Sequence, residues 1–206
     1  MSADKQFIEA LASPSPTPGG GGASAYAGAL AASLGLMVAN LTVGKPRYAD
    51  CEEELRETID KLRKCSDTLM HLIDEDARAF NGLVATWKLP EENEVQRTAK
   101  HLARQRALVG ACEVPIQIMR VCAKIIELVE VLAHKGTRLA VTDAGAAAAL
   151  AKGALKSAAL NVYINASGLS DRELAAALDE ETRDLVRTFC YQADVIYDYV
   201  LHEVMH

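Results

Sequence analysis

Apolar side chains recur every three or four residues through a long segment that begins near Asp50 and ends at Leu89-Pro90. This spacing matches the 3.6-residue period of an α-helix and predicts one helix of about eight turns with a single buried face. The positions that form this face are Leu55, Ile59, Leu62, Ser66, Leu69, Ile73, Ala77, Phe80 and Val84. Other long helices commonly cover such a face, so a helical bundle is the expected architecture.

Short segments containing Gly and Pro separate further helical patterns, and neither a β-rich run nor an internal repeat is found. Helices are predicted at 4–11, 23–41, 91 to beyond 108, 116–133, 143–165, and onward from a capping box at 170–173. Pro115 is expected to start a new helix or to kink the preceding one. Residues 12–22 contain three prolines and four glycines and are expected to be neither helix nor central strand. Residues 1–206 are therefore predicted to form one all-α domain, an up-and-down bundle of long helices.

Composition restricts the partners and the compartment of the protein. Half of the residues are apolar but only 5% are aromatic, and the dominance of Ala, Leu and Val favours closely packed helices. The net charge of −6 gives no reason to expect a nucleic-acid partner. Five cysteines without a CxxC motif argue against a disulfide framework, and no secretory signal is recognised, so a cytoplasmic location is expected.

Residues 19–44 carry no charge until the lysine that follows Gly44, and the segment is long enough to span a membrane. It is rich in Gly, Ala and Ser, however, and these residues contribute little transfer free energy into lipid. A helix buried on all sides within the protein is the preferred interpretation, and no membrane partner is expected.

The Pro- and Gly-rich loop is the sharpest local motif. Gly19, Gly20 and Gly21 allow a ligand to approach the backbone closely, and they precede a helix whose N-terminal N–H groups attract anions. No GK[ST] sequence follows and no strand precedes the loop, so it is neither a P-loop nor a dinucleotide-binding fingerprint. A flexible linker is the alternative interpretation.

Two acids and two amides are candidates for binding or catalysis. Asp76 falls at the border of the apolar stripe, where partial desolvation raises a carboxyl pKa and suits it to proton transfer; a structural ion pair is the alternative. Asp143 opens an Ala-rich helix, where an acid commonly caps the first turn. Asn161 and Asn165 lie four residues apart on one helix face, where they either bond to neighbouring groups or bind a ligand.

Residues 202–206 spell HExxH, the pattern of zinc proteases. They lie at the end of the chain, where helices fray, and the other histidines show no metal-ligand spacing. No metal site is therefore expected.

Seven ordered segments carry a family resemblance over nearly the whole chain. They are residues 16–21 (PTPGGG), 37–45 (MVANLTVGK), 72–80 (LIDEDARAF), 89–90 (LP), 114–115 (VP), 142–145 (TDAG) and 161–165 (NVYIN). In order and spacing they resemble the cyclodeaminase/cyclohydrolase family of folate enzymes. This family includes the C-terminal domain of formiminotransferase-cyclodeaminase and the stand-alone methenyltetrahydrofolate cyclohydrolases.

The resemblance implies a homodimeric all-α bundle with a folate groove walled by the glycine loop and the middle helices. It places Asp76 at the catalytic aspartate of the family and Asp143 at a second family aspartate. The implied substrate is a tetrahydrofolate derivative, with no further cofactor. Lys45 lies in the turn after the uncharged segment and is the candidate for binding the acidic tail of a folate, including a polyglutamylated one. A solvated turn lysine is the alternative interpretation.

Residues 143–145 and 157–163 are more similar to stand-alone cyclohydrolases than to the cyclodeaminase domain. The expected reaction is hydrolysis of 5,10-methenyltetrahydrofolate to 10-formyltetrahydrofolate, with Asp76 as general acid/base and Asp143 orienting water or substrate. A formiminotetrahydrofolate cyclodeaminase that releases ammonia is the first alternative. A non-catalytic helical dimerisation or folate-binding module is the second.

Overall fold

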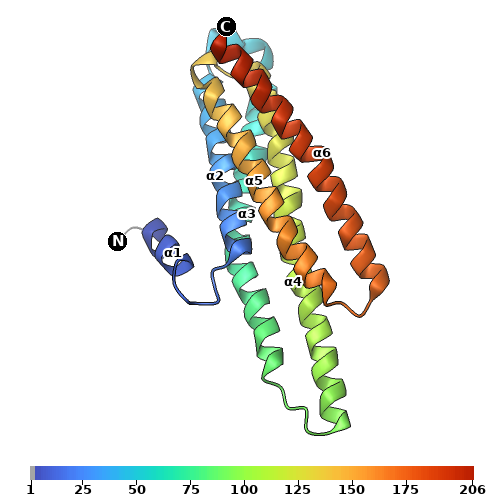
Figure 1. Ribbon diagram of the computed structural model, residues 1–206. Helices are drawn as coiled ribbons and strands as arrows, with labels where there is room; N and C mark the ends of the chain where they lie inside the picture. The colour runs from blue at the N-terminus through green and yellow to red at the C-terminus, as the bar shows by residue number, and fades with distance from the viewer. Residues whose placement is uncertain (1–2) are drawn as a thin grey trace.

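The computed structural model describes residues 3–206, and all regular elements in this range are helical. The helices are α1 (Ala3–Leu11), α2 (Gly20–Thr42), α3 (Glu52–Trp87), α4 (Glu94–Lys135), α5 (Val141–Ser167) and α6 (Arg172–Met205), with short 3₁₀ helices at Pro46–Cys51 and Arg138–Ala140. Figure 1 shows α2 to α6 side by side with alternating direction, while α1 stands apart at one side. The prediction of an all-α bundle is confirmed.

The starts of α2 and α6 differ from the predicted ones. Gly20–Gly22 belong to the first turn of α2, although the glycine run predicts a loop through Gly22. Glycine is unfavourable mainly in helix interiors, and this first turn packs tightly against α3, so the helix extends into the run. Asp171 rather than Ser170 caps α6, because its Oδ1 accepts hydrogen bonds from the N–H groups of Glu173 and Leu174 (3.1 and 3.0 Å).

Small residues allow α2 to pack closely against α3, α4 and α5. A Cβ on Gly28 would lie 2.9 Å from Leu69 Cδ1 and 3.0 Å from Cys122 Sγ, which leaves no room for a larger side chain. Gly35 approaches Leu62 in the same way, about two turns further along α2. The backbone of α2 therefore lies in the core of the bundle.

In the described part of the chain, α2 is the one helix that is long and apolar enough to cross a membrane, and 56% of that stretch is buried by other helices. The prediction of a core helix is confirmed, but α2 is not buried on all sides. Leu30, Met37 and Leu41 remain 40–46% exposed on its outer face.

Pro115 lies inside α4, which neither begins nor ends there, so the predicted helix start at this residue is wrong. A proline has no N–H, and the carbonyl of Ala111, four residues earlier, therefore loses its helical donor. Asn165 on α5 supplies a replacement, because its Nδ2 donates to the Ala111 oxygen at 2.7 Å. A side chain from a neighbouring helix thus satisfies the carbonyl that Pro115 leaves free.

Asn165→Ala is expected to destabilise the protein by about 1–3 kcal/mol, the cost of leaving a carbonyl of the interior without a donor. In a Pro115→Ala background the same change should cost at least about 1 kcal/mol less, because the backbone N–H restored at position 115 can bond to Ala111. Denaturant unfolding of the four variants in a double-mutant cycle measures the difference. Equal costs in the two backgrounds would show that Asn165 and Pro115 are not coupled.

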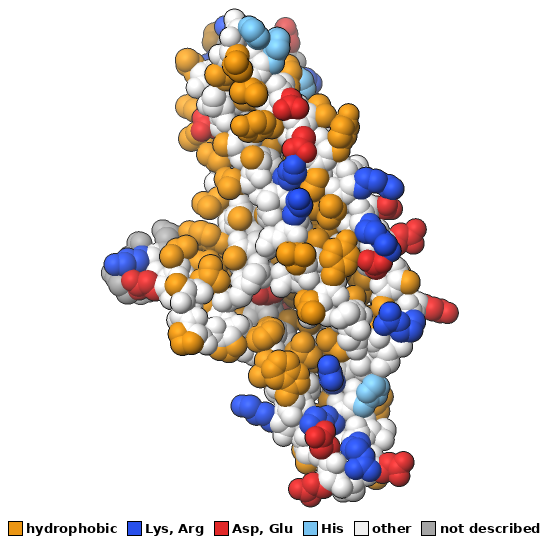
Figure 2. All heavy atoms as spheres, viewed as in Figure 1, with side chains coloured by type: hydrophobic (Ala, Val, Ile, Leu, Met, Phe, Trp, Pro, Cys, Tyr) orange, Lys and Arg blue, Asp and Glu red, His pale blue; other side chains and the backbone are white. Residues whose placement is uncertain are grey.

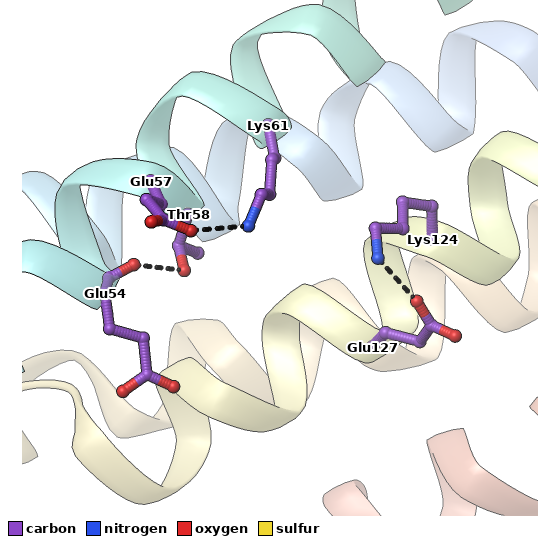
Figure 3. A network of polar contacts seen from close by, with 6 residues as sticks. All are labelled: Glu54, Glu57, Thr58, Lys61, Lys124 and Glu127. Atoms are coloured by element: carbon purple, nitrogen blue, oxygen red, sulfur yellow. Dashed lines mark hydrogen bonds and ion pairs between the residues drawn. The ribbon is translucent and has the colours of Figure 1, made fainter.

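One side of the bundle carries few charges. Exposed ion pairs cover the outer faces of α3 and α4, where Lys61 bonds to Glu57 and Lys124 bonds to Glu127, each at 2.8 Å (Figure 3). Exposed pairs of this kind contribute only about 0.2–1 kcal/mol each. By contrast, α2 carries no charged residue, and Figure 2 shows mainly hydrophobic and uncharged side chains over α2 and the adjoining part of α5. We call the exposed apolar side chains Leu30, Met37, Leu41, Leu160 and Ile164 of these two helices the uncharged flank. α5 also carries Lys152 and the exposed Lys156.

Candidate functional site

A cavity of about 420 Å³ opens where the loop before α2 meets α3, α4 and α5. Asp76 lines it together with the glycines and amides that the sequence predicts as substrate-binding: Gly19, Gly20, Gly21, Asn161 and Asn165. Three segments that are far apart in the sequence therefore meet at one place. The arrangement agrees with a groove walled by the glycine loop and the middle helices.

Asp76 is held at the first turn of α2. Its Oδ2 accepts a hydrogen bond from the backbone N–H of Gly22 at 3.0 Å, one of the N–H groups that a helix start leaves without an internal acceptor. A Cβ on Gly21 would lie 2.7 Å from Oδ2 and closer still to Oδ1. Only glycine at position 21 allows the carboxylate to approach the loop this closely.

Burial raises the pKa of Asp76 above its ordinary value, and the hydrogen bond from the Gly22 N–H offsets part of this effect. A carboxyl group with a raised pKa holds a proton more readily, which suits it to accept and return one during a reaction. Asp76 is also the only carboxylate among the described residues that line the cavity. The site therefore offers a single, partly desolvated acid/base group.

The two amides each use one group to bond to the protein. Asn161 Nδ2 donates to the Ser157 carbonyl at 3.1 Å, and Asn165 Nδ2 donates to the Ala111 carbonyl. Within residues 3–206 no donor bonds to the Oδ1 of either side chain, so both oxygens can accept a hydrogen bond from a ligand. Asn165 thus combines a structural bond with a position at the cavity wall.

The structure adds an apolar wall whose residues the sequence does not assign to the site. Phe80, Leu83 and Trp87 follow Asp76 on α3 at spacings of four, three and four, and they line the cavity opposite Arg104 of α4. The helical spacing from Asp76 is the signal that identifies the α3 residues. Arg104 carries no local signal, because only the packing of α4 on α3 brings it to the cavity.

Asp143 and Lys45 do not line the cavity. Asp143 lies in the first turn of α5 and Asn161 near its other end, which gives a separation of about 27 Å at the helical rise per residue. Lys45 follows the end of α2, whereas the glycines form its start, about 35 Å away. The expected roles of Asp143 beside Asp76 and of Lys45 at the same substrate are therefore not supported within one chain. The predicted helices at 23–41 and 143–165 already imply these separations, because Lys45 follows the first helix and Asp143 opens the second. The roles of Asp143 and Lys45 toward the substrate stay predictions.

The HExxH residues lie at the end of α6, with the ring centroids of His202 and His206 4.8 Å apart. Within residues 3–206 no three His, Cys, Asp or Glu side chains are grouped as a metal site would need. That the pattern binds no catalytic zinc stays a prediction.

The fold and the cavity define a helical-bundle protein that presents one desolvated carboxylate and a glycine backbone to a small ligand. The model of the formiminotransferase-cyclodeaminase family matches residues 4–184, so the chain belongs to this family. The family resemblance found in the sequence is thereby confirmed.

Three relatives illustrate the range of the family. The chain is 39% identical over 198 residues to the methenyltetrahydrofolate cyclohydrolase of Methylorubrum extorquens, covering 96% of this chain and 95% of that protein. It is 30% identical over 167 residues to the formimidoyltransferase-cyclodeaminase of Gallus gallus, covering 81% of this chain but only 31% of that longer protein. The solved structure of the formiminotetrahydrofolate cyclodeaminase of Thermotoga maritima matches with a TM-score of 0.81 and 27% identity, over 100% of this chain and 96% of that one.

Proposed function

We propose that this protein is an enzyme of one-carbon metabolism that hydrolyses 5,10-methenyltetrahydrofolate to 10-formyltetrahydrofolate. The observation that best supports this reaction is the position of Asp76, a partly desolvated carboxylate held by the Gly22 N–H at the cavity wall. Family membership and the 39% identity to a methenyltetrahydrofolate cyclohydrolase along nearly the full chain support a folate substrate.

The proposed substrate carries a cationic carbon between N5 and N10, and a carboxylate beside it favours the cation. The Asp76 carboxylate takes a proton from water while the hydroxide adds to this carbon, which gives a neutral tetrahedral adduct. The bond from the carbon to N5 then breaks, Asp76 returns its proton to N5, and the hydroxyl of the adduct loses its proton to solvent as the formyl C=O forms on N10. General acid–base help of this kind contributes about 10²–10⁴-fold in rate.

The surroundings of Asp76 support this role. The Gly22 N–H holds Oδ2, so the carboxylate keeps one orientation toward the cavity. The raised pKa favours the protonated form that must exist between the two steps. The Oδ1 atoms of Asn161 and Asn165 can accept hydrogen bonds from the N–H groups of a reduced pteridine ring.

Formiminotetrahydrofolate cyclodeaminase activity is the second candidate, and the structural likeness to the Thermotoga maritima cyclodeaminase favours it. In that reaction N10 attacks the formimino carbon on N5, Asp76 takes the N10 proton, and the proton then passes to the nitrogen that leaves as ammonia. Both reactions proceed through a tetrahedral carbon between N5 and N10, so one carboxylate can serve either.

A paired assay distinguishes the two activities because they change the methenyl chromophore in opposite directions. Hydrolysis of methenyltetrahydrofolate removes the chromophore, whereas cyclisation of formiminotetrahydrofolate creates it and releases ammonia. We expect the first reaction at a rate well above that of an enzyme-free control. Ammonia release without accelerated hydrolysis would favour the cyclodeaminase, and neither reaction would reject the proposed function.

We further propose that two copies form a homodimer through the uncharged flank. α2 has no charged residue, and Leu160 and Ile164 on α5 are 68% and 69% exposed. A monomeric protein rarely exposes a large continuous apolar surface without a partner. Ile164 also lines the cavity, so a contact on this flank would border the site.

Leu160→Asp is expected to convert the protein to a monomer at micromolar concentration, because it places a charge within the proposed contact. Val95→Asp is the matched control: Val95 is 79% exposed on α4, away from the uncharged flank, and its replacement should leave the dimer intact. Sedimentation velocity measures the oligomeric state of wild type and of both variants. A wild-type monomer, or dimers in both variants, would contradict the proposed contact.

A further inference from the structure

The mouth of the cavity carries an aromatic side chain and a cation that the acid–base step does not use. Trp87, at the end of α3, and Arg104, on α4, both line the cavity. Leu83 and Leu108 pack in one cluster between the two antiparallel helices, so they mark the same level of the bundle. Trp87 lies one turn beyond Leu83 and Arg104 lies one turn before Leu108. Both are therefore displaced toward the α3–α4 connection, away from Asp76.

Arg104 has neither an ion pair nor a hydrogen bond through its guanidinium within residues 3–206. Lys100, one turn earlier on α4, differs in that it pairs with Glu91 at 2.8 Å. Among the residues that line the cavity, Arg104 is the only Lys or Arg and Asp76 is the only acid. An arginine without a protein partner at the rim of an apolar cavity suits an anionic ligand group that can take two parallel hydrogen bonds, above all a carboxylate.

The two charges stand at different ends of the cavity. Leu83 lies about 10 Å from Asp76 along α3, and Arg104 lies about one turn further toward the mouth, with a long side chain that can reach back. Phe80 and Leu83 form an apolar stretch between them. The cavity therefore suits an elongated ligand with a cationic centre at one end, a flat apolar middle and an anionic group at the other end.

We propose that Arg104 binds a carboxylate of the glutamate tail of the substrate and that Trp87 packs against its benzoyl ring. This inference rests on the proposed folate substrate, in which an aminobenzoyl group joins the cationic one-carbon centre to the anionic tail. A guanidinium and a carboxylate bind in bidentate fashion, and an indole offers a flat apolar face to an aromatic ring. Arg104 thus takes the role that the sequence suggests for Lys45, which lies at the far end of α2.

Trp87 is the only tryptophan in the chain, so quenching of its fluorescence reports on a ligand at this place. Tetrahydrofolate and tetrahydropteroate, which lacks the glutamate, are titrated into wild type, Arg104→Ala and Arg106→Ala. Arg106 is the matched control, because it is also exposed on α4 but does not line the cavity. Arg104→Ala should raise the Kd of tetrahydrofolate about 10-fold and leave that of tetrahydropteroate unchanged, whereas Arg106→Ala should change neither.

Turnover of Arg104→Ala at saturating substrate should stay close to that of wild type, because the tail contact is made equally in the ground state and the transition state. Equal losses for the two ligands, or no loss for either, would overturn the assignment of Arg104 while wild-type binding and turnover keep the folate function intact. A loss of tetrahydrofolate binding in Lys45→Ala but not in Arg104→Ala would also overturn it. A wild-type protein that neither binds nor converts any folate would reject the proposed function itself, and the inference with it.

Discussion

Asp76→Asn is expected to lower the turnover of methenyltetrahydrofolate by about 10²–10⁴-fold while the protein remains folded. The amide retains an oxygen that can accept the Gly22 N–H bond, but it cannot take a proton from water. Steady-state rates, corrected for the enzyme-free reaction, measure the effect. Asp74→Asn is the matched control, because Asp74 is exposed on the same helix and should be replaceable without loss. A folded Asp76→Asn variant with wild-type turnover would remove Asp76 from the mechanism.

The same variant is expected to be more stable than wild type at neutral pH. Burial raises the folded-state pKa of Asp76, so the native protein binds this proton more tightly than the unfolded chain does. The ionised carboxylate therefore costs stability above its folded-state pKa, and this cost vanishes as the pH falls below the unfolded-state value of about 3.9. The unfolding free energies of wild type and Asp76→Asn should differ most at neutral pH and approach each other in acid. A difference that does not change with pH would show that the carboxylate is not desolvated in solution.

Gly21→Ala is expected to reduce kcat/KM by at least about 10²-fold, because a catalytic group displaced by even 1 Å loses about this much. The new Cβ would lie 2.7 Å from Asp76 Oδ2, so the carboxylate or the loop must shift and the Gly22 N–H bond is lost. Gly82→Ala is the matched control, since a Cβ on Gly82 meets open space on the same helix as Asp76. That control should retain activity and gain about 0.5–1 kcal/mol of stability. Wild-type kinetics in Gly21→Ala would mean that the close approach of Asp76 to the loop is not needed for catalysis.

Most of the helices can be predicted from local patterns because their causes are local. The apolar stripe of α3 and the break at Leu89-Pro90 predict a helix that ends just before these residues, and the observed helix ends at Trp87. The pattern fails where a contact from another helix decides the outcome. At Pro115 a new helix start or a kink is the local expectation, whereas α4 continues through it and Asn165 on α5 donates to the Ala111 carbonyl that the proline leaves free.

The residues of the candidate site also differ in whether their own sequence segment is enough to identify them. Asp76 and the glycine loop can be identified from their own segments, because a border position on a helix and a run of glycines are visible in the sequence. Arg104 cannot be identified from its own segment, because its place at the cavity depends on the register between α3 and α4. Asp143 has a clear motif, but the length of α5 separates it from the cavity within one chain, so its role stays a prediction.

The bond from Asn165 to the Ala111 carbonyl also constrains the order in which substitutions can accumulate during evolution. A lineage that lost Asn165 first would carry an unsatisfied carbonyl until Pro115 changed as well, whereas the reverse order passes through a stable intermediate. Relatives without proline at position 115 should therefore vary freely at position 165 as far as the fold is concerned. Those that keep the proline should retain asparagine or another donor there. Selection on the continuity of a helix can in this way preserve an amide at the wall of a ligand cavity.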